Sequence, residues 1–319
     1  METQDHPHHS PVIAAFSPET GAREPIEFGM AASRVTGAPL VVAVVVDPST
    51  LRGQFGGDET PELSPSVAQT VRHLENDFSR QGIAAEVRVI KDYTAARGIA
   101  RAIDEYSPEL VVVGSTGRGA KGSALLGSTA ERVIHAAACP VAVVPNGYLR
   151  PEVGVATIGL AYTQQPEADE ALRAAGALAR TGSARLRVIT VIDPKHAQEE
   201  AHGLLAEHHH EVGAEATTAA RTRFAIEADV RARIAEAAGD VQAEIDFMVD
   251  EPARALIAVT AHLDLLVIGS RALGPRRAVV LGSVSRRVAD RAACPVIVIP
   301  RGADDKTGEL LADADSHAR

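Results

Sequence analysis

The sequence predicts an α/β protein built from two repeated, doubly wound, five-stranded parallel sheets. Three observations carry this prediction. Short Val/Ile/Leu runs alternate with longer amphipathic stretches, which is typical of parallel strands joined by crossover helices. Runs such as residues 41–46 lack polar alternation, as expected when helices cover both faces of a sheet. Finally, the second half of the chain repeats the first.

The repeat sets the domain organisation of the 319-residue chain. Residues 114–145 and 269–300 align at an offset of 155 without a gap and share 15 of 32 positions. Earlier segments align at an offset of 146, so the second copy has gained a net nine residues between Pro194 and Gly269. We therefore predict domains at 1–148 and 152–302, followed by an acidic, loosely ordered tail at 303–319.

The elements follow in the same order in both copies. Apolar stripes predict amphipathic helices between the strands, for example at Val71, Leu74 and Phe78. Gly82 and Gly239 are expected to end the helices that precede the third strands. The predicted strands are 12–17, 39–47, 84–90, 109–114 and 140–145 in the first copy, and 157–163, 185–192, 243–248, 264–269 and 295–300 in the second.

The composition of the chain limits the classes of partner that it is expected to bind. The net charge of −10 and the lack of a dense Lys/Arg block argue against nucleic acid and against an anionic membrane surface. The longest apolar stretches are too short to cross a bilayer, and the polar start METQDHPHHSP has no hydrophobic signal segment. We expect a cytoplasmic protein.

Cysteine and histidine do not point to a metal site. Cys139 and Cys294 occupy equivalent positions of the two copies, which favours reduced core residues over a disulfide. The His-rich segment 196–215 accompanies the nine extra residues, and its acidic neighbours favour a solvated face. We predict no metal ligand in either group.

The strongest functional signal is a glycine-rich loop after each fourth strand. In the first copy Gly114 and Gly117 precede Gly127-Ser128 with the spacing G-x2-G-x9-G-S. Glycine permits positive φ and close approach of a ligand, and the following helix start would direct N–H groups at a phosphate. Ser128 and Thr129 can add hydroxyl contacts. The alternative interpretation is a tight turn with helix caps and no ligand. That interpretation would explain a glycine-rich loop in one copy, but it explains poorly why the loop occurs in both.

Two other phosphate motifs are rejected. Residues 117–122 match G-x-G-x-x-G, but they follow a late strand and are not followed by a βαβ unit, so a dinucleotide site is not predicted. The order around Lys121 also differs from Gly-Lys-Ser/Thr, and no P-loop ATPase is implied.

The G-x2-G-x9-G-S loop, the helix after it and the C-P-V-x-V-x-P segment resemble the universal stress protein family, over nearly all of both copies. The resemblance implies the adenine-nucleotide α-hydrolase-like fold with strand order 3-2-1-4-5. It also implies ATP as the ligand, with Mg²⁺ left open. The implied contacts are Gly114, Ser115, Gly117, Gly127, Ser128, Thr129, Ser17 and Asp47 in the first copy, and Gly269, Ser270, Gly282, Ser283 and Val284 in the second.

The chain departs from the family pattern at two places. Ala272 replaces the second loop glycine in the second copy, so the first site is the better match. The acidic residue that ATP-binding members carry after strand one is replaced by Ser17 and Thr163. Asp47 and Asp193, after strand two, suit either the rim of a nucleotide site or a turn.

These patterns predict a regulatory ATP-binding protein in the stress response, with no catalytic activity beyond weak hydrolysis. The alternative is an interaction scaffold of the same fold that has lost nucleotide binding. The resemblance further implies that the fifth strands, 141–144 and 296–299, pair with each other as an intrachain pseudo-dimer. Association into a homodimer of tandem chains is left open.

Overall fold

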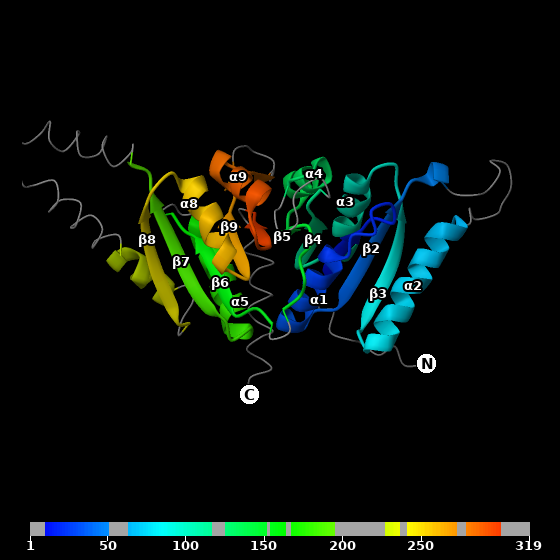
Figure 1. The fold of residues 1–319 in the computed structure, drawn as a ribbon, viewed down its shortest axis with the longest axis horizontal. Helices are drawn as coiled ribbons and strands as arrows, with labels where there is room; N and C mark the ends of the chain where they lie inside the picture. Colours follow the sequence, from blue (N-terminus) through cyan, green and yellow to red (C-terminus); the bar gives the residue numbers. More distant parts are fainter. Residues whose placement is uncertain are drawn as a thin grey trace, which may run out of the picture.

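The computed structural model describes residues 10–50, 63–116, 125–151, 154–163, 167–194, 227–236, 241–272 and 279–300. The predicted His-rich segment, Gly117, Gly239 and the acidic tail lie outside these ranges. Figure 1 shows two similar halves that meet in the middle of the molecule, with β3 and β8 at its two outer edges.

Each half contains five parallel strands in the order 3-2-1-4-5, which confirms the predicted fold class. The order is β3-β2-β1-β4-β5 in the first half and β8-β7-β6-β9-β12 in the second. The bounds lie close to those predicted: β1 Val12–Phe16, β2 Leu40–Val46, β3 Ala85–Lys91, β4 Leu110–Gly114 and β5 Val141–Val144, then β6 Thr157–Ala161, β7 Arg185–Ile192, β8 Ala243–Val249, β9 Leu265–Gly269 and β12 Val296–Ile299.

Helices cover both faces of this sheet, as the unbroken apolar strands require. Side chains of α1, α2 and α5 build one core, and those of α3, α4, α8 and α9 build the other. Both cores contain residues of the two halves, so neither layer stops at the domain boundary. The helices are α1 Glu24–Thr36, α2 Pro65–Gln81, α3 Ala95–Tyr106, α4 Ser128–Ala136, α5 Glu167–Thr181, α8 Pro252–Val259 and α9 Ser283–Arg291, with short turns η1 Pro48–Thr50 and η2 Thr260–His262.

Local capping explains several of these bounds. Ser64 and Thr94 accept backbone N–H bonds at the starts of α2 and α3. Gly82 ends α2 with φ of 63°, a left-handed conformation that glycine adopts without strain. The sequence therefore identified this helix end correctly.

The two halves join through an antiparallel pair between β5 and β12, which we call the seam. Ala142 lies opposite Ile297, flanked by Val143 opposite Val296 and Val141 opposite Val298. At the repeat offset of 155, Ala142 and Ile297 are equivalent positions, so the pseudo-two-fold axis passes between them. The seam converts two five-stranded sheets into a single ten-stranded sheet.

Both cysteines are buried, and neither is in a disulfide bond. Burial raises the pKa of the Cys294 thiol to about 12, which keeps it protonated near neutral pH. Cys139 is fully buried in the same layer of the core. Both cysteines therefore lie in the core, as predicted from their equivalent positions.

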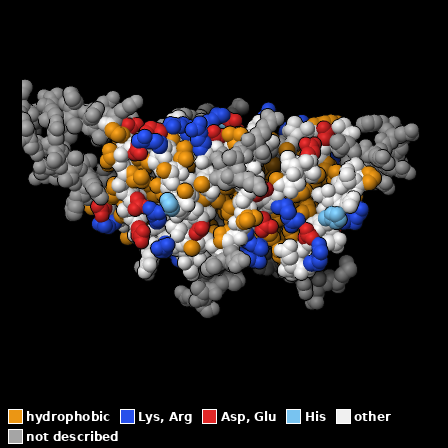
Figure 2. All heavy atoms as spheres, in the orientation of Figure 1, with side chains coloured by type: hydrophobic (Ala, Val, Ile, Leu, Met, Phe, Trp, Pro, Cys, Tyr) orange, Lys and Arg blue, Asp and Glu red, His pale blue; other side chains and the backbone are white. Residues whose placement is uncertain are grey.

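The described surface is mixed in character. Figure 2 shows acidic, basic and apolar side chains interspersed over the visible face, with Lys and Arg gathered over α8 and α9. Among the residues that the structure describes, no helix combines the length and the apolar character needed to cross a bilayer.

We expect Val298→Lys to lower the free energy of unfolding by roughly 3 kcal/mol or more, because it places an unpaired charge in the seam. Val298 is 1% exposed, whereas Val249, on the edge strand β8, is 71% exposed and supplies a matched control. Chemical denaturation and amide exchange would test this. Equal stability of the Val298→Lys and Val249→Lys variants, with unchanged exchange on β5 and β12, would contradict it.

Candidate functional site

A cleft opens at the carboxyl ends of the strands in the first half. It encloses about 1370 Å³, which is ample for a nucleotide-sized ligand. The ends of β1, β2, β4 and β5 contribute to its lining, together with the first turns of α1, α2, α3 and α4. Such crevices at the carboxyl edge are where open α/β sheets bind their ligands.

The cleft brings together every predicted first-copy contact that the structure describes. Those residues are Ser17, Asp47, Gly114, Ser115, Gly127, Ser128 and Thr129. They come from four strand ends or helix starts that are distant in sequence. Gly117 lies outside the described residues.

Gly114 and Gly127 lie in crowded surroundings. A Cβ on Gly114 would lie 3.2 Å from Cγ of Pro25 in α1, and a Cβ on Gly127 would lie 2.4 Å from Cγ2 of Thr116. Gly127 has the extended φ of −81°, and Gly114 is not among the residues with positive φ. The expectation that Gly114 serves the loop through positive φ is therefore wrong, and the physical reason for glycine is space.

Backbone hydrogen bonds hold the ends of the loop together. The Thr116 N–H donates to the Leu125 carbonyl at 2.8 Å, and the Ser115 N–H donates to the Val144 carbonyl at 2.8 Å. Helix α4 then begins at Ser128 with Gly127 as its N-cap, and no side chain caps it. Its first N–H groups can therefore bind an anion, which the helix dipole also favours.

Two hydroxyl groups beside this helix end have no hydrogen-bond partner. Within the described part of the chain, Oγ of Ser115 and Oγ1 of Thr116 are enclosed and unpaired. Ser270 is the equivalent of Ser115 in the second copy, and its Oγ is also enclosed and unpaired. Enclosed polar groups without partners are uncommon in proteins, so their recurrence at this position indicates a ligand or water that completes them.

The cleft wall carries more acidic than basic side chains. Among the described residues of the lining, Arg23 is the one basic side chain, and it donates to Asp77 at 2.8 Å. Backbone N–H groups and the helix dipole at the start of α4 are the groups of this described lining that suit a phosphate. The acidic lining residues are Glu19, Glu24, Glu27, Asp47 and Asp92.

Four of these carboxylates already have partners, and one of them is Glu27, which pairs with Arg150 at 3.9 Å. Asp47 accepts the Ser49 N–H at 2.8 Å, which lowers the pKa of Asp47 and makes it a turn residue. Glu24 accepts the Gly147 N–H at 2.8 Å. Asp92 is buried, with Arg97 at 3.6 Å and Arg101 at 3.8 Å. The sequence analysis missed Asp92, although it follows β3 as Asp47 follows β2.

The described residues hold no group of three or more His, Cys, Asp or Glu side chains arranged to bind a metal ion.

The second copy repeats the framework with different surroundings. Gly269 ends β9, and Gly282 is the N-cap of α9, which begins with Ser283 and Val284. Ser285 of α9 donates to the Gly269 carbonyl at 3.4 Å. The two-residue strands β10 Arg271–Ala272 and β11 Val279–Val280 pair as a small antiparallel ribbon. The structure does not describe the side chain of Ala272.

Three arginines of α8 and α9 have acidic partners. Arg287 binds Glu251 at 2.8 Å, and Arg286 binds Glu131 of the first copy at 2.7 Å. Arg254 pairs with Asp250. Because these three guanidinium groups already bind carboxylates, they are not free to bind a phosphate.

The second copy also contacts the first-copy loop directly. Asp290 of α9 accepts the Leu126 N–H at 3.0 Å, one residue before the Gly127 cap. Together with Arg286–Glu131, this bond joins α9 to the start of α4 across the seam. The equivalent of Asp290 in the first copy is His135. No sequence pattern within either copy indicated this contact.

The comparisons with known proteins agree with the fold. The sequence profile of the universal stress protein family matches residues 10–145 and again 155–300. A universal stress protein of Mycobacterium tuberculosis is 31% identical over 207 residues, covering 60% of this chain and 61% of that relative. The chain thus spans less than two thirds of that relative's length. A universal stress protein of Thermus aquaticus is 32% identical over 145 residues, covering 45% of this chain and 97% of that protein.

Solved structures show the same fold at lower identity. A Pseudomonas aeruginosa protein described as a universal stress protein superposes with a TM-score of 0.63 at 15% identity, covering 96% of this chain and 98% of that one. A universal stress protein from Archaeoglobus fulgidus gives a TM-score of 0.55 at 18% identity, covering 92% and 99%. The chain belongs to the universal stress protein family and carries two of its domains in tandem.

Replacing Asp290 by Ala should speed exchange of the Leu126 amide by roughly tenfold or more, because the amide loses a charged acceptor. Asp290→Asn keeps an acceptor oxygen and should preserve most of the protection. Residue-resolved hydrogen exchange measures both variants. If Leu126 exchanges at the same rate in all three proteins, the bond does not hold the loop.

Proposed function

We propose that this protein is a regulatory, non-catalytic universal stress protein of the cytoplasm that binds ATP in its first domain. The observation that carries the proposal is the uncapped N-terminus of α4 next to the unpaired hydroxyls of Ser115 and Thr116. Both features border one cleft, and both are completed by a phosphate-bearing ligand.

The proposed roles follow from the position of each residue in the cleft. Gly114 and Gly127 leave room for close approach, while Ser128 and Thr129 present N–H and hydroxyl groups to the phosphates. Ser17 and Asp47, after β1 and β2, border the part of the cleft that would take the nucleoside. Mg²⁺ would accompany the phosphates and offset part of their repulsion with the acidic wall.

A regulatory role fits the side chains of the cleft better than catalysis. The buried carboxylate of Asp92 is balanced by Arg97 and Arg101, and the described lining offers no His, Cys or Lys as nucleophile or base. The bond from Leu126 to Asp290 gives the loop a route to influence the second domain. ATP would thus act by ordering the loop and changing the contacts of the protein with its partners.

The second domain is the lesser candidate for a nucleotide. It keeps Gly269, Ser270, Gly282, Ser283 and Val284 but has Ala272 in place of the second loop glycine. We therefore propose one strong site per chain.

A scaffold without nucleotide is the second candidate, favoured by the acidic wall of the cleft and the absence of a carboxylate at Ser17. Mass spectrometry of small molecules released from denatured, freshly purified protein separates the two. Bound adenine nucleotide supports the proposal. Its absence, together with an unchanged melting temperature in millimolar ATP, favours the scaffold.

Gly127→Ala should weaken ATP binding at least about tenfold, because the new Cβ collides with Thr116 and moves the loop. Thr116→Ser removes Cγ2, the atom in that collision, so the double variant Gly127→Ala/Thr116→Ser should recover most of the affinity. Calorimetric titration with ATP measures this cycle.

Melting curves without nucleotide provide the control for folding, since φ at Gly127 suits any residue. Equal ATP affinity in all variants would contradict the assigned role of this loop. Equal loss in the single and double variants would contradict the steric argument.

A further inference from the structure

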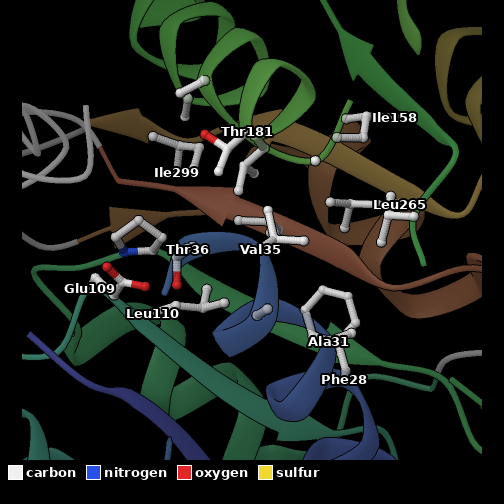
Figure 3. Close-up of a pocket in the computed structure, with 18 residues that line it drawn as sticks. Phe28, Ala31, Val35, Thr36, Glu109, Leu110, Ile158, Thr181, Leu265 and Ile299 are labelled. Atoms are coloured by element: carbon white, nitrogen blue, oxygen red, sulfur yellow. The ribbon is translucent and has the colours of Figure 1, made fainter. Parts of the chain in front are cut away.

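A second, apolar cavity lies where α1 and α5 face each other across the seam. Figure 3 shows residues of both domains around it: Phe28, Ala31 and Val35 from α1, Thr181 from α5, and Ile299 from β12. Its volume is about 70 Å³. The cavity is separate from the nucleotide cleft, because the two linings share no residue.

Glu109 is the one ionisable residue in the described lining of this cavity. Figure 3 places its carboxyl beside Thr36 at one end of the lining, away from Phe28 and Leu265. Thr36 donates a hydrogen bond to this carboxyl, and its Oγ1 accepts the Ala38 N–H at 3.3 Å. Among the described residues, Oε1 of Glu109 is enclosed and has no partner.

A comparison of the two domains explains why this oxygen is unpaired. Asp264 is the repeat equivalent of Glu109, and its carboxylate accepts the N–H groups of Ala156 and Thr157 at 2.9 and 2.8 Å. In the first domain Pro11 stands at the position of Thr157. Proline has no N–H, so Glu109 lacks one of the two backbone donors that Asp264 uses. One oxygen of the Glu109 carboxyl thus stays without a partner at the edge of the cavity.

We infer that this cavity is a binding site for a small primary aliphatic amine, with its ammonium group on Glu109 and its carbon chain between α1 and α5. The apolar lining favours the chain, and the unpaired oxygen requires a donor. An ammonium group also supplies the positive charge that a buried carboxylate needs, and no described lining residue supplies it.

The volume limits the length of the ligand. One buried water needs roughly 10–15 Å³, so the cavity accepts on the order of five non-hydrogen atoms. An n-butylammonium ion has this size. Rotation of the Glu109 carboxyl about its last bond presents either oxygen to the ligand.

The protonation state of Glu109 provides a second way to recognise amine binding at this cavity. Burial raises its pKa to about 7, and the bond from Thr36 opposes this only in part. Alkylamines stay protonated well above that pH. Binding of an amine should therefore weaken as pH falls below about 7, when Glu109 becomes neutral.

The test uses the full chain and the probes n-butylamine, n-butanol and butyrate in calorimetric titrations at pH 8. We expect n-butylamine to bind at least about tenfold more tightly than n-butanol, and butyrate to bind least. Glu109→Gln keeps the shape but should remove the preference for the amine and its pH dependence. Equal affinity for amine and alcohol, or an unchanged preference in Glu109→Gln, would overturn the inference.

Ala177→Leu supplies the steric control, because Ala177 lines the cavity and is 9% exposed. The larger side chain should abolish binding of all three probes. Gly127→Ala, in the nucleotide cleft, should leave amine binding unchanged, which separates this site from the proposed ATP site. Failure of every probe to bind wild-type protein would also overturn the inference.

The protonation of Glu109 should also affect the stability of the ligand-free protein. A carboxyl with a folded-state pKa above its unfolded value holds its proton more tightly when folded, so stability is lost as pH rises from about 4.5 through 7. The melting temperature of wild type should therefore fall relative to Glu109→Gln between pH 5 and pH 8. Parallel profiles for the two proteins would show that Glu109 is not buried in this way in solution.

Discussion

The antiparallel pairing of β5 with β12 is the constraint on which the rest of the molecule depends. Each five-stranded sheet would otherwise expose a Val/Ile-rich edge, and such edges promote association. Pairing them inside one chain removes both edges and brings α1 close to α5. The two cores consequently continue across the domain boundary. The inter-domain cavity and the contact of Asp290 with the first loop both exist because of this pairing.

Tandem duplication allows the pseudo-two-fold axis to carry unlike residues. In a symmetric dimer of identical domains, residues at the axis would meet their own copies. Here Glu131 meets Arg286 at 2.7 Å, and these are equivalent positions of the two repeats. Identical residues would place like charges together, whereas divergence has produced attraction. Ala142 opposite Ile297 similarly combines a small and a large side chain.

Divergence has also given the domains different roles at equivalent positions. Asp290 holds the Leu126 amide beside the first loop, while its equivalent is His135. Asp264 binds two backbone N–H groups, while Glu109, facing Pro11, has an unpaired oxygen.

The sequence alone was enough to predict the strands and the loop residues Gly114, Gly127 and Ser128, because hydrophobic periodicity, the internal repeat and the glycine motif can be read directly from the chain. The order of the strands came from the resemblance to a family. The motif singled out Gly114 and Gly127 but did not show what surrounds them. In the structure, a Cβ at these positions would lie against side-chain atoms of Pro25 and Thr116. Only the tertiary structure decided that Asp92 lines the cleft, that Asp290 binds the first loop and that Glu109 lines an apolar cavity. These contacts join residues far apart in the chain, so they arise from sheet order and the seam, which no local pattern encodes.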